Sequence, residues 1–246
     1  MANDTVIGQG ELRSTSPTTS KIKLQTAPGV MKEVQHSTIG GLAVFEGDIV
    51  LSRGLEQLGV AITGPGVRWP NKTVVFEIDL GLPNPDRVTK AIQHWEQNTI
   101  IKFKKRTTEK DFVIFKAGDG CSSAVGRLGG VQFVTLGPDC SAGNAIHEIG
   151  HTVGLWHEQS REDRDRFVMV MFDNIQPELA HNFNQHINDG DDVGDYDYGS
   201  IMHYPRTAFA IDTSKPTLVT LHGEPIGQRE ALSKGDIAAV TAIYTS

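Results

Sequence analysis

Residues 147–158 have the sequence H-E-I-G-H-T-V-G-L-W-H-E, and this stretch does most to decide the fold and the chemistry of the chain. In a helix, His147 and His151 share a face, with roughly 5–6 Å between their Cβ atoms. Both imidazoles can therefore bind one ion at about 2.0–2.1 Å, the usual Zn–N distance. Glu148 then stands beside the ion without binding it. The pattern predicts a zinc site on a helix.

Gly154 and His157 complete this site. Glycine tolerates a positive φ, so Gly154 lets the chain leave the helix and turn back, which brings in His157 as a third ligand. Zinc lowers the pKa of a water in the fourth position to about 7, and a nearby carboxylate can take its proton. The alternative is a set of unrelated histidines on an amphipathic helix. With 9 histidines in 246 residues, chance produces the whole pattern on the order of once in 10,000.

A methionine motif follows. About 45 residues after His157, residues 200–204 have the sequence S-I-M-H-Y, and this combination is the signature of the metzincins. Within that group the chain resembles the astacin family of zinc metalloendopeptidases. The resemblance rests on residues 147–165, on 200–204, and on P-I-G-Q-R at 225–229 with L-S at 232–233. It covers nearly the whole chain from about residue 60 onward.

The resemblance implies an α+β metzincin fold. A twisted, mostly parallel sheet and the active-site helix would form an upper subdomain, above an irregular lower subdomain with a C-terminal helix. One Zn²⁺ per chain would be bound by His147, His151 and His157, and Glu148 would be the general base in hydrolysis of internal peptide bonds. Two other classes stay open: a zinc-stabilised binding module without catalysis, and a zinc hydrolase for non-peptide amides or esters.

Three further residues take roles from the resemblance. Tyr204 matches the tyrosine that is a displaceable fifth zinc ligand in astacins and then donates to the tetrahedral intermediate, a role that suits a phenol. Met202 would form the apolar floor under the metal, and Glu158 would anchor the new amino terminus after activation. Without the resemblance, we would interpret Tyr204 as a half-buried aromatic residue, Met202 as a core residue and Glu158 as a surface carboxylate.

The N-terminal region carries a second signal, F-E-G-D-I at residues 45–49. By itself it is a strand end followed by a Gly-Asp turn. Beside an astacin domain it resembles the F-x-G-D segment of the family's propeptide, whose aspartate displaces the catalytic water from zinc. Asp48 would close the open position. We therefore expect a latent zymogen, with a propeptide at residues 1–59 and a catalytic domain at residues 60–246.

The activation cut can be bracketed. The family's mature chain begins about nine residues before the tryptophan that matches Trp69, which points to Val60-Ala61. Arg53 and Lys32 are possible first cuts for a trypsin-like activating protease. Residues 1 to about 35 are rich in Thr, Ser and Gln with little periodicity, so we expect them to form a loose segment.

Composition excludes several classes of function. A net charge of −7 and a pI near 5.7 give no basic surface for nucleic acid. No apolar run reaches the roughly 18 residues of a membrane span. We expect a secreted monomer that acts on protein or peptide substrates, although the opening M-A-N-D-T lacks the apolar core of a secretory signal.

Cys121 and Cys140 are the only two cysteines. They match one of the two disulfides usual in astacins, so the resemblance implies a bridge between them. Closing a loop of about 20 residues contributes roughly 3 kcal/mol in the chain-entropy description. The second astacin bridge has no counterpart here, a departure of bacterial type. Two free thiols in a reducing compartment are the alternative.

Turn and capping residues predict the main elements. Strands are expected at 74–79, 111–116 and 131–136, with a first helix opening at Asn84-Pro85. The zinc helix should run from near Ser141 to Gly154. Ser233-x-x-Asp236 predicts a capping box that opens a C-terminal helix.

The remaining polar residues suggest no further site. The acidic stretch from Asp189 to Asp197 lacks the spacing of a calcium loop, and we expect a solvated loop there. The other histidines of the C-terminal half are expected to be structural or exposed: His181, His186, His203 and His222.

Overall fold

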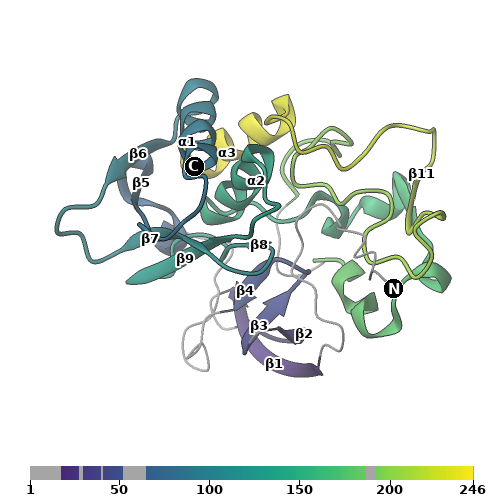
Figure 1. The fold of residues 1–246 in the computed structure, drawn as a ribbon. Helices are drawn as coiled ribbons and strands as arrows, with labels where there is room; N and C mark the ends of the chain where they lie inside the picture. Colours follow the sequence, from purple (N-terminus) through teal and green to yellow (C-terminus); the bar gives the residue numbers. More distant parts are fainter. Residues whose placement is uncertain (1–17, 28–29, 40, 52–64, 187–191, 246) are drawn as a thin grey trace.

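The computed structural model describes residues 18–27, 30–39, 41–51, 65–186 and 192–245 (Figure 1). Three predicted features lie outside these ranges: the possible cut at Arg53, the expected mature start at Val60-Ala61, and Asp189 with Asp191 in the acidic stretch. No described helix is both long and apolar enough to cross a membrane.

A five-stranded sheet forms the upper subdomain, in the order β6-β5-β7-β9-β8. Its strands are β5 (Thr73–Ile78), β6 (Lys102–Lys105), β7 (Phe112–Ala117), β8 (Cys121–Ser122) and β9 (Val131–Leu136). All neighbours are parallel except β8 and β9. The sheet is therefore mostly parallel, as predicted, and the three predicted strands are each placed to within one residue.

Two helices, α1 (Asp86–Asn98) and α2 (Ala142–Thr152), lie together over this sheet (Figure 1). Trp95 of α1 is fully buried, and its indole Nε1 donates to the Ile146 carbonyl of α2 at 3.0 Å. The predicted start of α1 is slightly wrong. Pro85 precedes the helix, and Asn84 has a left-handed φ of 50°, so its side chain does not cap α1.

A capping box opens α2 where the sequence places it. Ser141 Oγ accepts from Asn144 N at 3.2 Å, and Asn144 Oδ1 accepts from Ser141 N at 2.9 Å. After the helix, Gly154 has a φ of 110°. A Cβ there would meet no atom within 4 Å, so the backbone conformation rather than space calls for glycine.

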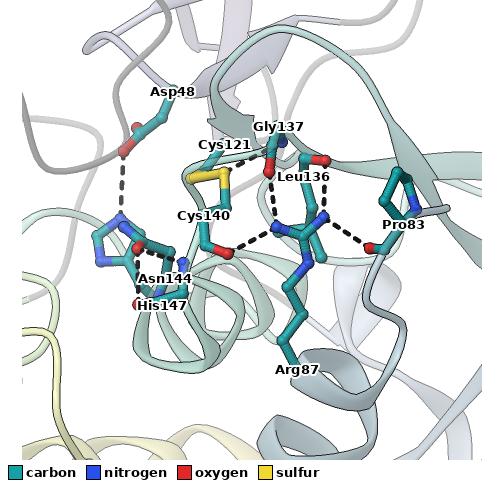
Figure 2. The surroundings of a disulfide bond; sticks show 10 residues. Asp48, Pro83, Arg87, Cys121, Leu136, Gly137, Cys140, Asn144 and His147 are labelled. Carbon is teal, nitrogen blue, oxygen red and sulfur yellow. Dashed lines mark hydrogen bonds and ion pairs between the residues drawn. A yellow bond between two sulfur atoms is a disulfide. The ribbon is translucent and has the colours of Figure 1, made fainter. Parts of the chain in front are cut away.

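The Cys121–Cys140 disulfide forms, as the resemblance implied, and joins β8 to the segment before α2 (Figure 2). Next to it, the Arg87 guanidinium donates to the carbonyls of Gly137 and Cys140 at 2.6 Å each and of Leu136 at 3.2 Å. These contacts fix the loop that leads into α2.

The lower subdomain is largely irregular, as expected. Its short ladder pairs β10 (Val168–Val170) with β11 (Leu218–Thr220). Among all the described residues, the 3-10 turns are η1 (Pro65–Val67), η2 (Pro70–Lys72), η3 (Glu158–Ser160), η4 (Arg164–Arg166), η5 (Phe172–Asn174) and η6 (Pro177–Phe183).

The C-terminal helix α3 (Lys234–Thr245) begins with the predicted capping box. Asp236 N donates to Ser233 Oγ at 2.9 Å, and Ser233 N donates to Asp236 Oδ2 at 2.8 Å. The Asp236 carboxylate also accepts from Ser200 Oγ at 2.7 Å and from Ile201 N at 3.0 Å. The start of α3 thus holds the methionine turn in place.

A separate antiparallel sheet in the order β1-β2-β3-β4 forms from residues 18–51. Its strands are β1 (Thr18–Ala27), β2 (Val30–Ile39), β3 (Leu42–Phe45) and β4 (Ile49–Leu51). The expectation of a loose segment up to about residue 35 is wrong for residues 18–27 and 30–35, which form strands. Val34 and Ile22 pack with Phe45 and with Val125, so distant residues supply the apolar contacts that the local composition lacks.

Candidate metal centre

Three histidine rings meet beneath α2. His147 and His151 lie one turn apart on the helix, and the turn at Gly154 brings His157 back to them. The three residues are at most 1% exposed, and their ring centroids lie 4.7–5.4 Å apart. The structure therefore brings together the residues that the sequence predicts as ligands.

Each ring has an acceptor at Nδ1, which leaves Nε2 to face the centre. His147 Nδ1 donates to the Ile201 carbonyl at 2.8 Å, and His151 Nδ1 donates to the Leu155 carbonyl at 2.9 Å. His157 Nδ1 donates to Glu46 Oε2 at 2.8 Å. Such partners fix the tautomer and orientation of histidines that bind a metal through Nε2.

Asp48 lies among the three Nε2 atoms. Its Oδ2 is 3.2 Å from His147 Nε2 and 3.3 Å from His157 Nε2, and its Oδ1 is 3.5 Å from His151 Nε2. Figure 2 shows the carboxylate reaching toward His147. Burial alone would raise the pKa of Asp48, but the three imidazoles hold it well below its usual range.

The donor set fits a zinc ion. The four ligand atoms of Asp48, His147, His151 and His157 lie within 4.8 Å of one another. Asp48 Oδ1 and His151 Nε2 are buried and have no hydrogen-bond partner among the described residues. A cation between them would satisfy both, and three imidazoles with one carboxylate are typical zinc ligands.

The charges around the centre also favour a cation. Burial lowers the pKa of His147 to about 3, with Arg229 adding to the effect. Burial alone would lower the pKa of His157 too, but the carboxylates of Asp48 and Glu46 raise it to about 9. Two buried carboxylates thus create a negative potential where the ion would lie.

Met202 lies directly under α2. A Cβ on Gly150 would approach Met202 Sδ to 2.5 Å, so glycine at this position lets the helix and the methionine turn pack closely. The Met202 carbonyl accepts from Glu158 N at 3.2 Å. The methionine turn therefore supports the segment that carries the third histidine.

Comparison with known proteins identifies the group. A model of the peptidase family described as Astacin matches residues 61–245. The chain belongs to the astacin family. The family, the α+β fold and the class of zinc metalloprotease that the sequence predicted are thereby confirmed, with zinc as the metal.

Relatives of this astacin are known from several animals. Astacin-like metalloprotease toxin 1 of Loxosceles intermedia is 37% identical over 221 residues, covering 85% of this chain and 84% of the toxin. Meprin A subunit beta of Homo sapiens is 38% identical over 215 residues, covering 83% of this chain but 30% of the meprin. Zinc metalloproteinase nas-36 of Haemonchus contortus is 37% identical over 233 residues, and the match covers 82% of this chain and 38% of the relative. The chain thus spans less than half the length of the last two relatives.

A solved structure agrees with the fold. High choriolytic enzyme 1, a hatching enzyme zinc-protease from Oryzias latipes, superposes with a TM-score of 0.67 at 33% identity. The match covers 72% of this astacin and 92% of that chain.

Two catalytic candidates of this astacin lie close to the histidines. Glu148 follows His147 on α2 and is 1% exposed. The Tyr204 ring packs on His157 with centroids 4.6 Å apart, and its hydroxyl donates to the Glu46 carbonyl at 2.5 Å. In the uncleaved chain, the Tyr204 hydroxyl is therefore held by Glu46, a residue of the N-terminal region.

Glu158 lies at the back of this centre, partly buried rather than on the surface. Its Oε1 accepts from Asp197 N at 2.8 Å and lies 3.7 Å from Arg161 Nε. Burial raises the pKa of Glu158 to about 7. The side chain borders a cavity of about 90 Å³ that Trp156 and Ile243 also line.

A polar cluster behind His157 was not predicted from the sequence. Glu46, Ser160 and His186 join there, and the buried His186 is structural, which is one of the two outcomes expected for it. Burial alone would raise the pKa of Glu46, but His186 and His157 lower it to about 2. The only signal in the sequence was a charged residue inside the F-E-G-D segment.

Proposed function

We propose that this chain is a secreted astacin-type zinc endopeptidase that residues 1–59 hold latent, with residues 60–246 as the catalytic domain. The observation that carries the proposal is the Asp48 carboxylate, which lies 3.2–3.5 Å from all three Nε2 atoms. A carboxylate there occupies the position that a hydrolytic zinc site keeps for water. Residues 1–59 are termed the prosegment.

The catalytic roles follow from the chemistry of the site. Zinc held by His147, His151 and His157 would supply Lewis acidity, lowering the pKa of a bound water to about 7. Glu148 takes the proton of the attacking water and passes it to the leaving nitrogen. Tyr204, once its hydroxyl leaves the Glu46 carbonyl, donates to the oxyanion that develops on the scissile carbonyl.

The prosegment also covers the edge of the sheet. Ser123 N donates to the Asp48 carbonyl at 3.0 Å, and Val50 N donates to the Ser123 carbonyl at 2.8 Å. Ser123 directly follows β8, the edge strand of the five-stranded sheet. An extended peptide substrate would use such edge groups for binding, so the prosegment competes for them as well as for the metal.

Activation would expose both the metal and the edge. A cut that produces a new amino terminus near Val60-Ala61 supplies a cation, and Glu158 beside its cavity is a suitable carboxylate to receive it. Secretion is supported by the Cys121–Cys140 disulfide, since such bridges persist in oxidising compartments, and by the relation to a toxin.

Digestion of a peptide library by the chain before and after limited proteolysis tests this proposal. We expect cleavage of internal peptide bonds only after the prosegment is cut, and loss of that cleavage with a zinc chelator. A cleaved, zinc-loaded chain that leaves all peptides intact would instead favour a binding module. Hydrolysis of amide or ester compounds alone would favour a non-peptide hydrolase.

A further inference from the structure

The Glu46 carboxylate is buried although blocking of the metal by Asp48 does not require it. The side chain is 0% exposed and stands two residues before Asp48, in the turn between β3 and β4. Its backbone has a φ of 47°, a region that residues with a Cβ seldom adopt. An acidic residue that is both buried and held in this conformation suggests a specific purpose.

Three groups of the catalytic domain donate to this carboxylate. His157 Nδ1 lies 2.8 Å from Glu46 Oε2, and both Ser160 Oγ and His186 Nε2 lie 2.7 Å from Oε1. An ionised carboxylate only accepts hydrogen bonds, so all three groups must be donors. Hydrogen bonds to an ionised group are among the strong ones.

The catalytic domain builds this pocket from its own contacts. His186 N donates to the Ser160 carbonyl at 2.7 Å, and the His186 ring packs on Trp156 with centroids 4.3 Å apart. The donors are at most 5% exposed. Without Glu46, the buried donor atoms His157 Nδ1, Ser160 Oγ and His186 Nε2 would lose this acceptor, and three converging donors favour a carboxylate in the pocket.

We propose that Glu46 is a second anchor of the prosegment and a positioning residue for the third metal ligand. Its carboxylate occupies the three-donor pocket of His157, Ser160 and His186, and holds the His157 ring with Nε2 toward the metal. The inference rests on the proposed function in that it takes the uncleaved chain to be the zinc-bound latent form. Asp48 then closes the open position, while Glu46 increases the affinity for zinc.

The consequence is a change of metal retention on activation. A carboxylate that accepts from a metal-binding histidine orients the ring and raises its basicity, and loss of such a partner typically weakens metal binding by about 10–100-fold. When the prosegment leaves, His157 loses this partner. The uncleaved chain should therefore keep its zinc longer than the cleaved chain.

Zinc release from the uncleaved full-length chain tests the inference. All variants carry Glu148→Gln, which prevents self-processing, and zinc transfer to a coloured chelator is followed in time. We expect Glu46→Gln and Glu46→Ala to release zinc about 10–100-fold faster than the parent. Glu33→Gln is the matched control, because Glu33 is an exposed residue of the same sheet that pairs with Lys21.

The visible spectrum of the cobalt-substituted chain reports on the metal ligands directly. A purely structural role of Glu46 would leave this spectrum unchanged. We expect Glu46→Gln, which keeps the size of the side chain, to shift the visible absorption of bound Co²⁺, since the His157 donor changes. Ser160→Ala removes one donor of the pocket without touching a ligand. Its effect should be smaller and should not add to that of Glu46→Gln, because both act on one network.

Unchanged zinc release and an unchanged cobalt spectrum in folded Glu46→Gln, matching Glu33→Gln, would overturn the inference. Far-UV circular dichroism and an intact disulfide establish that the variants are folded. The measurement needs no substrate. The latency proposal is tested separately, because an uncleaved Asp48→Ala chain without activity would contradict it. The two proposals can therefore fail independently of each other.

Discussion

At the residue scale, the proposed general base is a carboxylate that is shielded from bulk water. Glu148 is 1% exposed and directly follows the first histidine on α2. We predict that Glu148→Gln in the cleaved chain keeps one zinc per chain and loses at least about 100-fold in kcat, the scale of a lost general base. Elemental analysis and steady-state kinetics on one peptide measure both quantities. Turnover close to that of the parent would exclude Glu148 from this role.

The proposed latency rests on one further carboxylate, that of Asp48. Asp48 is 3% exposed and occupies the centre of the three histidines. We predict that the uncleaved Asp48→Ala chain cleaves peptides, because no side chain then competes with water for the open position. The uncleaved Asp48→Asn chain should cleave peptides more slowly than the uncleaved Asp48→Ala chain, since an amide oxygen still reaches the open position. The measurement is the initial rate of cleavage of a quenched fluorescent peptide, with electrophoresis to check that the chain stays uncleaved. An inactive Asp48→Ala chain would contradict the role of Asp48 in latency.

At the scale of elements, the site is assembled by supports that come from far along the chain. The Asp236 carboxylate at the start of α3 is 5% exposed and accepts from Ser200 and Ile201 of the methionine turn. We predict that Asp236→Ala lowers the free energy of unfolding by about 3 kcal/mol, since it removes a helix cap and leaves buried donors unpaired. Asp86→Ala is the control, because Asp86 is exposed in the first turn of α1 and should cost less than about 1 kcal/mol. Urea unfolding compares the two, and equal losses would mean that Asp236 supports nothing beyond its own helix.

The helices and strands also differ in how well the sequence could predict them. The histidines of α2 follow the helical period, and the ends of β5, β7 and β9 are marked by turn residues, so both could be placed from local pattern. The hairpin of β1 and β2 could not, because its apolar partners include Val125, which is distant in sequence. Glu46 was missed for the same reason, since 111 residues separate it from His157 and 140 from His186.

At the scale of the whole molecule, a bound zinc ion would stabilise the uncleaved chain, because its ligands belong to separate segments. Its proposed ligands come from α2, from the segment after Gly154 and from the prosegment. A ligand that binds only the folded chain at 100 times its Kd stabilises it by about 2.7 kcal/mol. We predict that chelation of zinc lowers the Tm of the uncleaved chain, and less so in Asp48→Ala, which has one ligand fewer. Calorimetry with and without zinc measures the shift, and identical Tm values would show that no ion is bound.

Docking of the prosegment on the lower subdomain should weaken in acid. His181 of η6 is 6% exposed, and its Nε2 lies 3.5 Å from Ser37 Oγ of β2. Burial lowers the pKa of His181, and the charge of His36 in the prosegment adds to the effect. A hydrogen bond to the Glu178 backbone and the charge of Glu46 oppose it.

The direction of the effect follows from this lowered pKa. The unfolded chain binds a proton at His181 near pH 6.5 but the folded chain does so only at lower pH, so the stability contributed by the neutral ring is present above about pH 6.5 and is lost as the pH falls. We predict that the uncleaved chain is digested faster by a second protease at pH 5.5 than at pH 7.5, and that His181→Gln reduces this difference. His222→Gln is the control, because His222 is exposed. A pH dependence that survives His181→Gln unchanged would place the acid-sensitive group elsewhere.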